Sequence, residues 1–131
     1  MQPLILPASL EALTALQPFI RSAAHAFSER AAQEIALAVH ELCTNIIRHA
    51  YRGSDGKIYL EVVYQQCSIT FMIRDNAPHA FALPREIMQP DPASLPEGGW
   101  GIYILHKVMS QVEYRRLQNG NEWILKKNLC D

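Results

Sequence analysis

Hydrophobic residues recur along the chain with two different periods. Over residues 58–64 and 69–73, apolar side chains alternate with other residues, and a tight turn near Gln66 separates the two runs. This alternation predicts a β-hairpin with one buried face. A second set of apolar residues is spaced three or four positions apart, as on one face of a long helix. This set consists of Ile35, Val39, Leu42, Ile46 and Ala50.

The N-terminal part predicts a short strand followed by a helix. Residues 4–6 form an apolar run that Pro7 ends, which is typical of an edge strand. Ser9 is a suitable N-cap for a helix from residue 10 to about residue 27. Pro18 lies inside this helix and must kink or restart it, because proline lacks the N–H group that the helix needs. Residues 28–30 then separate it from the longer helix.

The C-terminal part predicts a long loop, a third helix and a second hairpin. Residues 52–56 are rich in glycine and end the long helix. Residues 75–97 show no periodicity and contain repeated prolines, and loops this long in a compact domain are usually functional or disordered. The glycines of residues 98–101 open a helix, and residues 112–117 and 123–127 form a hairpin around Asn119-Gly120.

The order of these elements predicts an α+β fold. Helices packed on one face of a mainly antiparallel sheet give a two-layer α/β sandwich. The other face of the sheet is then exposed to solvent or covered by a partner.

Length and charge restrict the functional class. The 131 residues fit one domain over residues 1–131. Twelve Lys and Arg against thirteen Asp and Glu give a net charge of −1, which argues against binding to nucleic acid. No run approaches the roughly 20 apolar residues of a membrane span, and the first residues lack the features of a signal peptide. We therefore expect a cytoplasmic protein without a membrane partner.

The three cysteines are Cys43, Cys67 and Cys130. They are odd in number, far apart in the sequence and contain no CxxC pair. This pattern argues against a disulfide framework and a structural zinc site, and it predicts three free thiols.

Three short motifs carry candidate chemistry. Glu41 and Asn45 are one turn apart on the long helix, beside its apolar face. Asp75 follows the second strand of the first hairpin. The glycines at 98, 99 and 101 let a backbone approach a ligand closely, and the helix N-terminus that they open attracts phosphate. Taken singly, each has an ordinary alternative: a solvated polar pair, a turn that bonds to its own backbone, and a flexible helix entry.

Taken together and in this order, the motifs resemble the nucleotide-binding boxes of the GHKL ATPase superfamily, and most closely the anti-sigma-factor serine/threonine kinases. The long helix resembles the N box of that family through Glu41, Asn45, His49, Ala50 and Tyr51. Asp75-Asn76-Ala77 resembles its Asp-x-Gly motif, with alanine in place of glycine. Gly98-Gly99-Trp100-Gly101 resembles its second glycine box.

The resemblance implies a Bergerat ATP-binding fold in which the long loop covers ATP. It implies that Asn45 holds Mg²⁺, that Glu41 is the catalytic residue, and that Asp75 accepts a hydrogen bond from adenine. The other residues that it assigns to nucleotide binding are His49, Ala77, Gly98, Gly99 and Gly101. No cation stands directly before Gly98, so Arg85 in the loop, or Arg48 on the helix, is the candidate phosphate contact.

The same resemblance implies a function. The chain would phosphorylate a serine of a STAS-domain anti-sigma antagonist and regulate a sigma factor or similar regulator by partner switching; relatives often form homodimers. The alternative is a non-catalytic module of the same fold that sequesters a partner. A histidine-kinase catalytic domain is disfavoured, because 131 residues leave no room for a phosphoacceptor hairpin. We expect His40 and His49 to be helix-packing residues and not phosphoacceptors.

Overall fold

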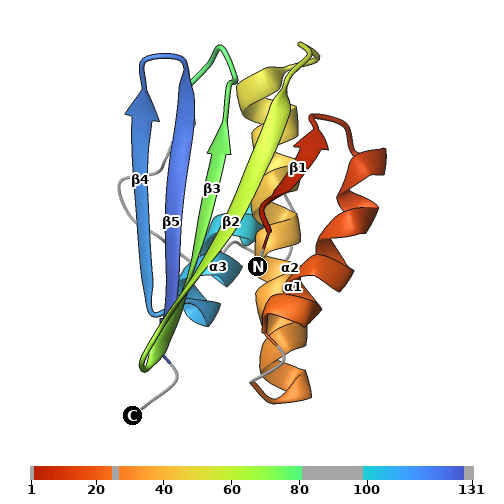
Figure 1. Ribbon diagram of the computed structural model, residues 1–131. Coiled ribbons are helices and arrows are strands. Elements are labelled where there is room, and N and C mark those ends of the chain that lie inside the picture. The colour runs from red at the N-terminus through yellow and green to blue at the C-terminus, as the bar shows by residue number, and fades with distance from the viewer. Residues whose placement is uncertain (1, 25–26, 81–98, 129–131) are drawn as a thin grey trace.

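The computed structural model describes residues 2–24, 27–80 and 99–128 and contains a five-stranded sheet (Figure 1). The strand order is β1-β2-β3-β5-β4, and every neighbouring pair is antiparallel. The strands are β1 (Leu4–Pro7), β2 (Lys57–Gln65), β3 (Ser68–Asp75), β4 (Gln111–Leu117) and β5 (Gly120–Asn128). The edge strand and both predicted hairpins are confirmed.

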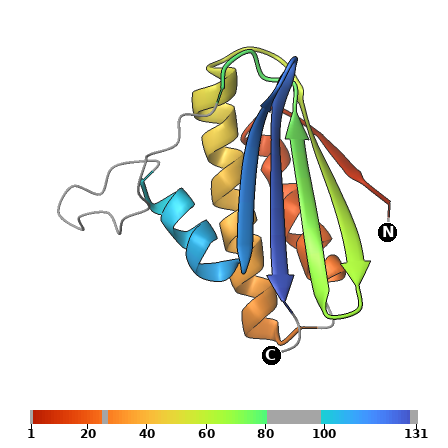
Figure 2. The ribbon, with the colours of Figure 1, turned by 90° about the vertical axis from the view of Figure 1, so that its left-hand side faces the viewer.

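The helices of the described residues all lie on one face of the sheet (Figure 2). Helix α2 packs against α1 on one side and α3 on the other. The helical segments are η1 (Glu11–Ala15, 3₁₀), α1 (Leu16–Ala23), α2 (Glu29–Asn45), η2 (Ile46–Tyr51, π) and α3 (Gly99–Val108). This arrangement confirms the two-layer α+β fold.

The core lies between α2 and the inner face of the sheet. The predicted apolar face of the long helix is fully buried, and so are alternate residues of β2 and β3 such as Ile58 and Ile73. Trp123 of β5 is the largest fully buried side chain. Burial at about 25 cal/mol per Å² of apolar surface makes this contact the main source of stability.

Two helices differ from the sequence-based expectation. The first begins as a 3₁₀ turn, in which Ser9 Oγ accepts a hydrogen bond from the Ala12 N–H at 3.3 Å, and it restarts as α1. Pro18 then falls in the first turn of α1, where an N–H has no partner within the helix. The chain leaves the α-helical form after Asn45 and makes a π-helical turn, which ends at a left-handed Arg52 with φ of 52°.

Three charged residues on adjacent strands, Arg74, Glu122 and Arg115, form ion pairs on the outer face of the sheet. Glu122 of β5 is only 3% exposed, because arginines from both neighbouring strands cover it. Arg74 Nε lies 2.6 Å from one carboxylate oxygen, and an Arg115 guanidinium nitrogen lies 2.9 Å from the other.

The expectation of three free thiols is wrong. Cys67 is disulfide-bonded, whereas Cys43 is a buried free thiol. Separation along the sequence does not measure distance in a folded chain, so the spacing argument failed for Cys67. No helix in the described ranges is long and apolar enough to cross a membrane.

Candidate functional site

The strongest candidate for a ligand-binding group is the carboxylate of Asp75, the last residue of β3. Asp75 is 5% exposed. Its Oδ1 accepts three hydrogen bonds: from the backbone N–H of Ala77 at 2.9 Å, and from the backbone and side-chain nitrogens of Asn121 at 3.1 and 3.0 Å. Its Oδ2 is buried and has no hydrogen-bond partner within the described residues. Leaving a buried carboxylate oxygen unpaired costs free energy. This oxygen is therefore available to a donor from a ligand.

Asn121 holds the paired oxygen of Asp75. Its side-chain nitrogen also donates to the carbonyl of His79 at 3.1 Å, and its oxygen accepts the hydroxyl proton of Tyr114. A Cβ added to Gly120 would lie 1.8 Å from the carbonyl oxygen of Asp75, so glycine is required where β5 meets the end of β3. Asn121 was not identified from the sequence. The only signal for it was its place next to the Asn119-Gly120 turn.

Arg116 holds the turn that follows Asp75. Its guanidinium donates to the carbonyl oxygens of Ala77 and Pro78 at 2.9 and 3.2 Å. Ala77 is buried, and the one non-glycine residue with positive φ in the described ranges is Arg52. Alanine at this position therefore carries none of the left-handed strain of about 1–2 kcal/mol that replacing glycine can introduce.

The local environment raises the pKa of Asp75. Burial raises it most strongly, and hydrogen bonds from Ala77 and Asn121 and the charge of Arg116 lower it only in part. The ionised form therefore costs free energy in the folded protein. A hydrogen-bond donor at Oδ2 would relieve that cost.

Helix α2 supplies a second buried polar group. Asn45, its last residue, is 3% exposed, and its side-chain nitrogen has no partner in the part of the chain that the structure describes. Glu41 lies one turn earlier and is partly exposed. Cys43, between them, has its pKa raised to about 12, first by burial and then by the charge of Asp75. The turn of α2 that carries Glu41 and Asn45 is therefore within electrostatic range of Asp75.

The third motif begins α3. Gly99 is its first residue, Gly101 lies in its first turn, and α3 packs beside α2 (Figure 2). N–H groups in the first turn of such a helix have no partner within it and attract anions. Gly98 and Arg85 lie outside the described residues, so their predicted roles stay predictions.

The expectation that the two histidines of α2 and η2 pack in the helix layer is wrong. His40 and His49 are both exposed, because their positions fall outside the apolar face of the helix. Arg48 is exposed as well. The predicted part of His49 in nucleotide binding stays a prediction.

The described residues offer few ligands to a metal ion. Within the described residues, no three His, Cys, Asp or Glu side chains gather closely enough to hold one. The unpaired atom of Asn45 is the amide nitrogen, which donates hydrogen bonds and does not bind Mg²⁺, so only the amide oxygen of this residue could serve as a hard ligand. Mg²⁺ needs few protein ligands when phosphates and water supply the others, so a metal could enter together with a nucleotide.

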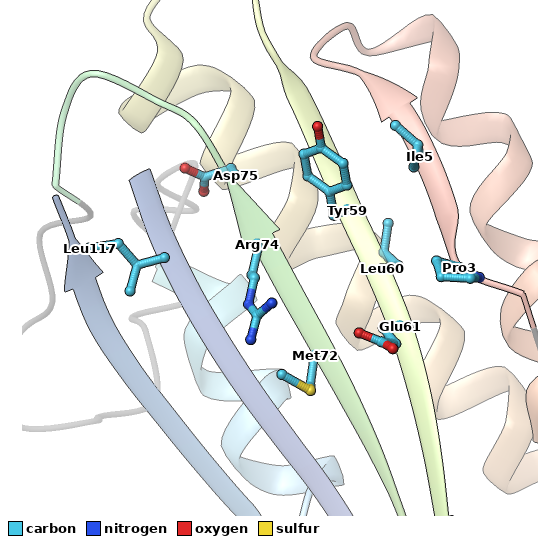
Figure 3. Close-up of a pocket in the computed structure, with 9 residues that line it drawn as sticks. All are labelled: Pro3, Ile5, Tyr59, Leu60, Glu61, Met72, Arg74, Asp75 and Leu117. Atoms are coloured by element: carbon cyan, nitrogen blue, oxygen red, sulfur yellow. The ribbon is translucent and has the colours of Figure 1, made fainter. Parts of the chain in front are cut away.

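A cavity that Asp75 helps to line opens on the outer face of the sheet (Figure 3). It has a volume of about 420 Å³. Apolar side chains such as Ile5, Tyr59 and Met72 line it together with Glu61 and Arg74. The cavity is open to solvent on the face opposite the helices, so Asn45 and the N-terminus of α3 are not part of it.

Comparisons with known proteins show the family to which the chain belongs. Residues 6–127 match the family described as Histidine kinase-like ATPase domain. Serine-protein kinase RsbW of Bacillus cereus (strain AH187) is 27% identical over 88 residues, which cover 62% of this chain and 54% of RsbW. RsbW of Bacillus thuringiensis (strain Al Hakam) is 28% identical over 89 residues, with the same coverage of 62% and 54%. The chain thus spans about half the length of the curated relatives it matches.

A solved structure shows the same fold. The histidine kinase domain of the blue-light activated histidine kinase from Erythrobacter litoralis EL346 has a TM-score of 0.57 at 17% identity. The match covers 94% of this chain and 61% of that chain. Because the family match extends over residues 6–127, nearly the whole sequence, the chain belongs to the family of histidine kinase-like ATPase domains.

Proposed function

We propose that this chain is a cytoplasmic, ATP-dependent protein kinase that transfers the γ-phosphate to a serine or threonine of a partner protein. The observation that carries the proposal is the one-sided pairing of Asp75, which leaves one buried carboxylate oxygen for a ligand donor. The family match and the relatives named serine-protein kinases support the choice of ligand and reaction.

Asp75 would recognise the base. Its free oxygen is suited to accept a hydrogen bond from the exocyclic amino group of adenine, whereas guanine carries a carbonyl oxygen at the equivalent position. A hydrogen bond to a charged group contributes about 1.5–3 kcal/mol, which corresponds to a preference of roughly ten- to a hundred-fold for adenine.

Asn45 and the first turn of α3 would bind the phosphate end. The amide oxygen of Asn45 would hold Mg²⁺, and the metal, when bound, neutralises charge on the phosphates. The N–H groups of the first turn of α3, which begins at Gly99, would bind phosphate oxygens.

Glu41 would orient the attacking hydroxyl and accept its proton. It lies one helical turn before Asn45 and is partly exposed, so a side chain from another protein has access to it. Positioning and charge neutralisation are the main requirements of phosphoryl transfer.

The proposed partner is a STAS-domain anti-sigma antagonist, with a sigma factor or a similar regulator controlled by partner switching. The name of the RsbW relatives supports the kinase part of this proposal. Homodimer formation is part of the proposal and rests on the resemblance alone.

The test is phosphate transfer from radiolabelled Mg-ATP to a purified STAS-domain protein. We expect Glu41→Gln to reduce transfer by at least about 100-fold, the lower end of the range for general bases. Glu34→Gln is the matched control, because Glu34 lies on the same helix with its side chain 47% exposed and paired with Arg30. Absence of transfer by the unmodified protein, or equal transfer by both variants, would refute the catalytic role.

A second candidate is a binding module that sequesters its partner without transfer. The observation behind it is that Ala77, unstrained in the turn after Asp75, stands where the resemblance places glycine. Calorimetry distinguishes the two, since this candidate requires ATP binding with no phosphorylated partner.

A further inference from the structure

The hydroxyl of Tyr51 joins two parts of the candidate site. Tyr51 ends η2, which continues directly from the helix of Asn45, and it is 1% exposed. Its oxygen accepts the backbone N–H of Asn76 at 3.0 Å and lies 2.5 Å from the carbonyl oxygen of Lys57 and 2.6 Å from Oδ1 of Asn76. A phenol has one proton to donate and can also accept, so it satisfies the Asn76 N–H and one of the two oxygens.

Asn76 is also held from the strand beside it. Its Oδ1 accepts the backbone N–H of Lys57 at 2.9 Å. Tyr51, Lys57 and Asn76 therefore form a closed set of hydrogen bonds at the point where β2 begins and β3 ends. The residue next in the chain to Asp75 is fixed through both its backbone and its side chain.

Gly56 allows this set of bonds to be compact. A Cβ added there would lie 2.2 Å from Cε1 of Tyr51 and 2.6 Å from Oδ1 of Asn76. Both distances are shorter than real Cβ contacts allow, so the ring and the amide pack directly on the Gly56 backbone. The Gly56 carbonyl is in turn held by the Ala8 N–H at 2.9 Å.

The hydroxyl stays protonated at neutral pH. The pKa of Tyr51 is raised to about 12; burial is the largest cause, and the backbone hydrogen bond to Asn76 opposes it. The hydroxyl proton that these hydrogen bonds need is therefore present at neutral pH.

We propose that Tyr51 is a positioning residue for base recognition: its hydroxyl holds the backbone of Asn76 and thereby sets the direction in which the free oxygen of Asp75 points. The inference rests on the proposed binding of ATP and assigns Tyr51 no contact with the nucleotide. Loss of the hydroxyl affects the base end of the site and leaves the phosphate end unchanged.

The test compares Tyr51→Phe with Tyr64→Phe. Both variants keep the ring and lose one hydroxyl that bonds to a backbone group; that of Tyr64 donates to the carbonyl of Ala23 at 2.7 Å, at the end of α1. Calorimetry measures the Kd of Mg-ATP, Mg-GTP and Mg-tripolyphosphate, the last of which has no base. Thermal unfolding and near-ultraviolet circular dichroism check that each variant is folded.

We expect Tyr51→Phe to weaken ATP binding by about three- to ten-fold, the equivalent of one buried hydrogen bond, and to change GTP and tripolyphosphate binding less than about two-fold. Tyr64→Phe should change none of the three. If Tyr51→Phe does not fold, Asn76→Ala removes the side-chain half of the same set of bonds and should reduce the preference for ATP over GTP in the same way.

Two results would overturn the inference while leaving ATP binding intact: an unchanged ratio of ATP to GTP affinity in the folded variant, or a parallel loss of all three ligands. An unmodified protein that binds no ATP would overturn the proposed function together with this inference. The two failures are therefore distinguishable.

Discussion

Replacing Asn121 with alanine tests whether this residue holds the candidate site together. Asn121 is fully buried. Its amide donates to Asp75 Oδ1 at 3.0 Å and to the His79 carbonyl at 3.1 Å, and it accepts the Tyr114 hydroxyl proton. Asn121→Ala removes these three side-chain bonds. It keeps the bond from its own backbone N–H to Asp75 at 3.1 Å.

The expected destabilisation follows from the three bonds. A hydrogen bond to a charged group contributes about 1.5–3 kcal/mol and a neutral one about 0.5–1.5 kcal/mol. The sum is about 2.5–6 kcal/mol, and water that enters the vacated space would recover part of it. We expect about 3 kcal/mol, a large fraction of the roughly 5–15 kcal/mol by which a domain of this size is stable.

The assay is equilibrium unfolding in urea at pH 7, followed by circular dichroism, without nucleotide. Asn128→Ala is the matched control, because Asn128 is exposed at the far end of the same strand. Its effect should stay within about 0.5 kcal/mol. The reasoning is refuted if Asn121→Ala costs less than about 1 kcal/mol or no more than the control.

Three further predictions concern charge and close packing. Because the pKa of Asp75 is raised above 3.8 in the folded protein, its ionisation lowers stability as the pH rises through that pKa. At pH 7, the free energy of unfolding of Asp75→Asn should therefore be at least as large as that of the unmodified protein, and any difference should disappear as the pH falls towards 3.8. The variant should also bind ATP roughly ten- to a hundred-fold more weakly. Burial raises the pKa of Glu122, but its two arginine partners lower it further, to a value below 4.5. Glu122→Gln should cost about 1–2 kcal/mol at pH 7, and urea titrations should show the difference closing as the pH falls below 4.5. Gly56→Ala should cost about 2–3 kcal/mol through its clash with Tyr51, against about 1 kcal/mol for Gly53→Ala, which meets no atom but has a φ of +86°. Equal costs for the two glycine variants would contradict the packing argument.

Periodicity predicted most of the fold, because it reports which residues face the core. The apolar face of the long helix and the alternation in residues 58–64 do not depend on small changes in backbone geometry. The Asn119-Gly120 pair predicted the β4–β5 hairpin because it is a local turn signal. The π-helical turn at Ile46–Tyr51 was not predicted. A π-helical turn is only slightly wider than an α-helical turn and keeps Ile46 and Ala50 buried, so the hydrophobic pattern does not reveal it.

The site was predictable only where its residues form local motifs. The motif positions Asn45 and Asp75 proved to be buried polar groups, each with an unpaired atom in the described part of the chain. Asn121 and Arg116 were missed because their contacts with the Asp75 turn depend on the register between β3 and β5 and on the β4–β5 hairpin. No local sequence pattern reports a strand register across 46 residues.

The two carboxylate oxygens of Asp75 have different roles: one stabilises the fold, and the other is left for a ligand. All three fixed donors bind one carboxylate oxygen, and the other oxygen is buried without a partner in the described residues. A buried carboxylate selected for stability alone would have both oxygens paired, or an uncharged residue would replace it. Asn121→Ala should therefore lose stability together with the geometry of the site, whereas Asp75→Asn should lose base recognition and keep its stability. If both variants lost stability equally, the unpaired oxygen would be a structural group, and Asp75 would no longer support the assignment of a nucleotide site.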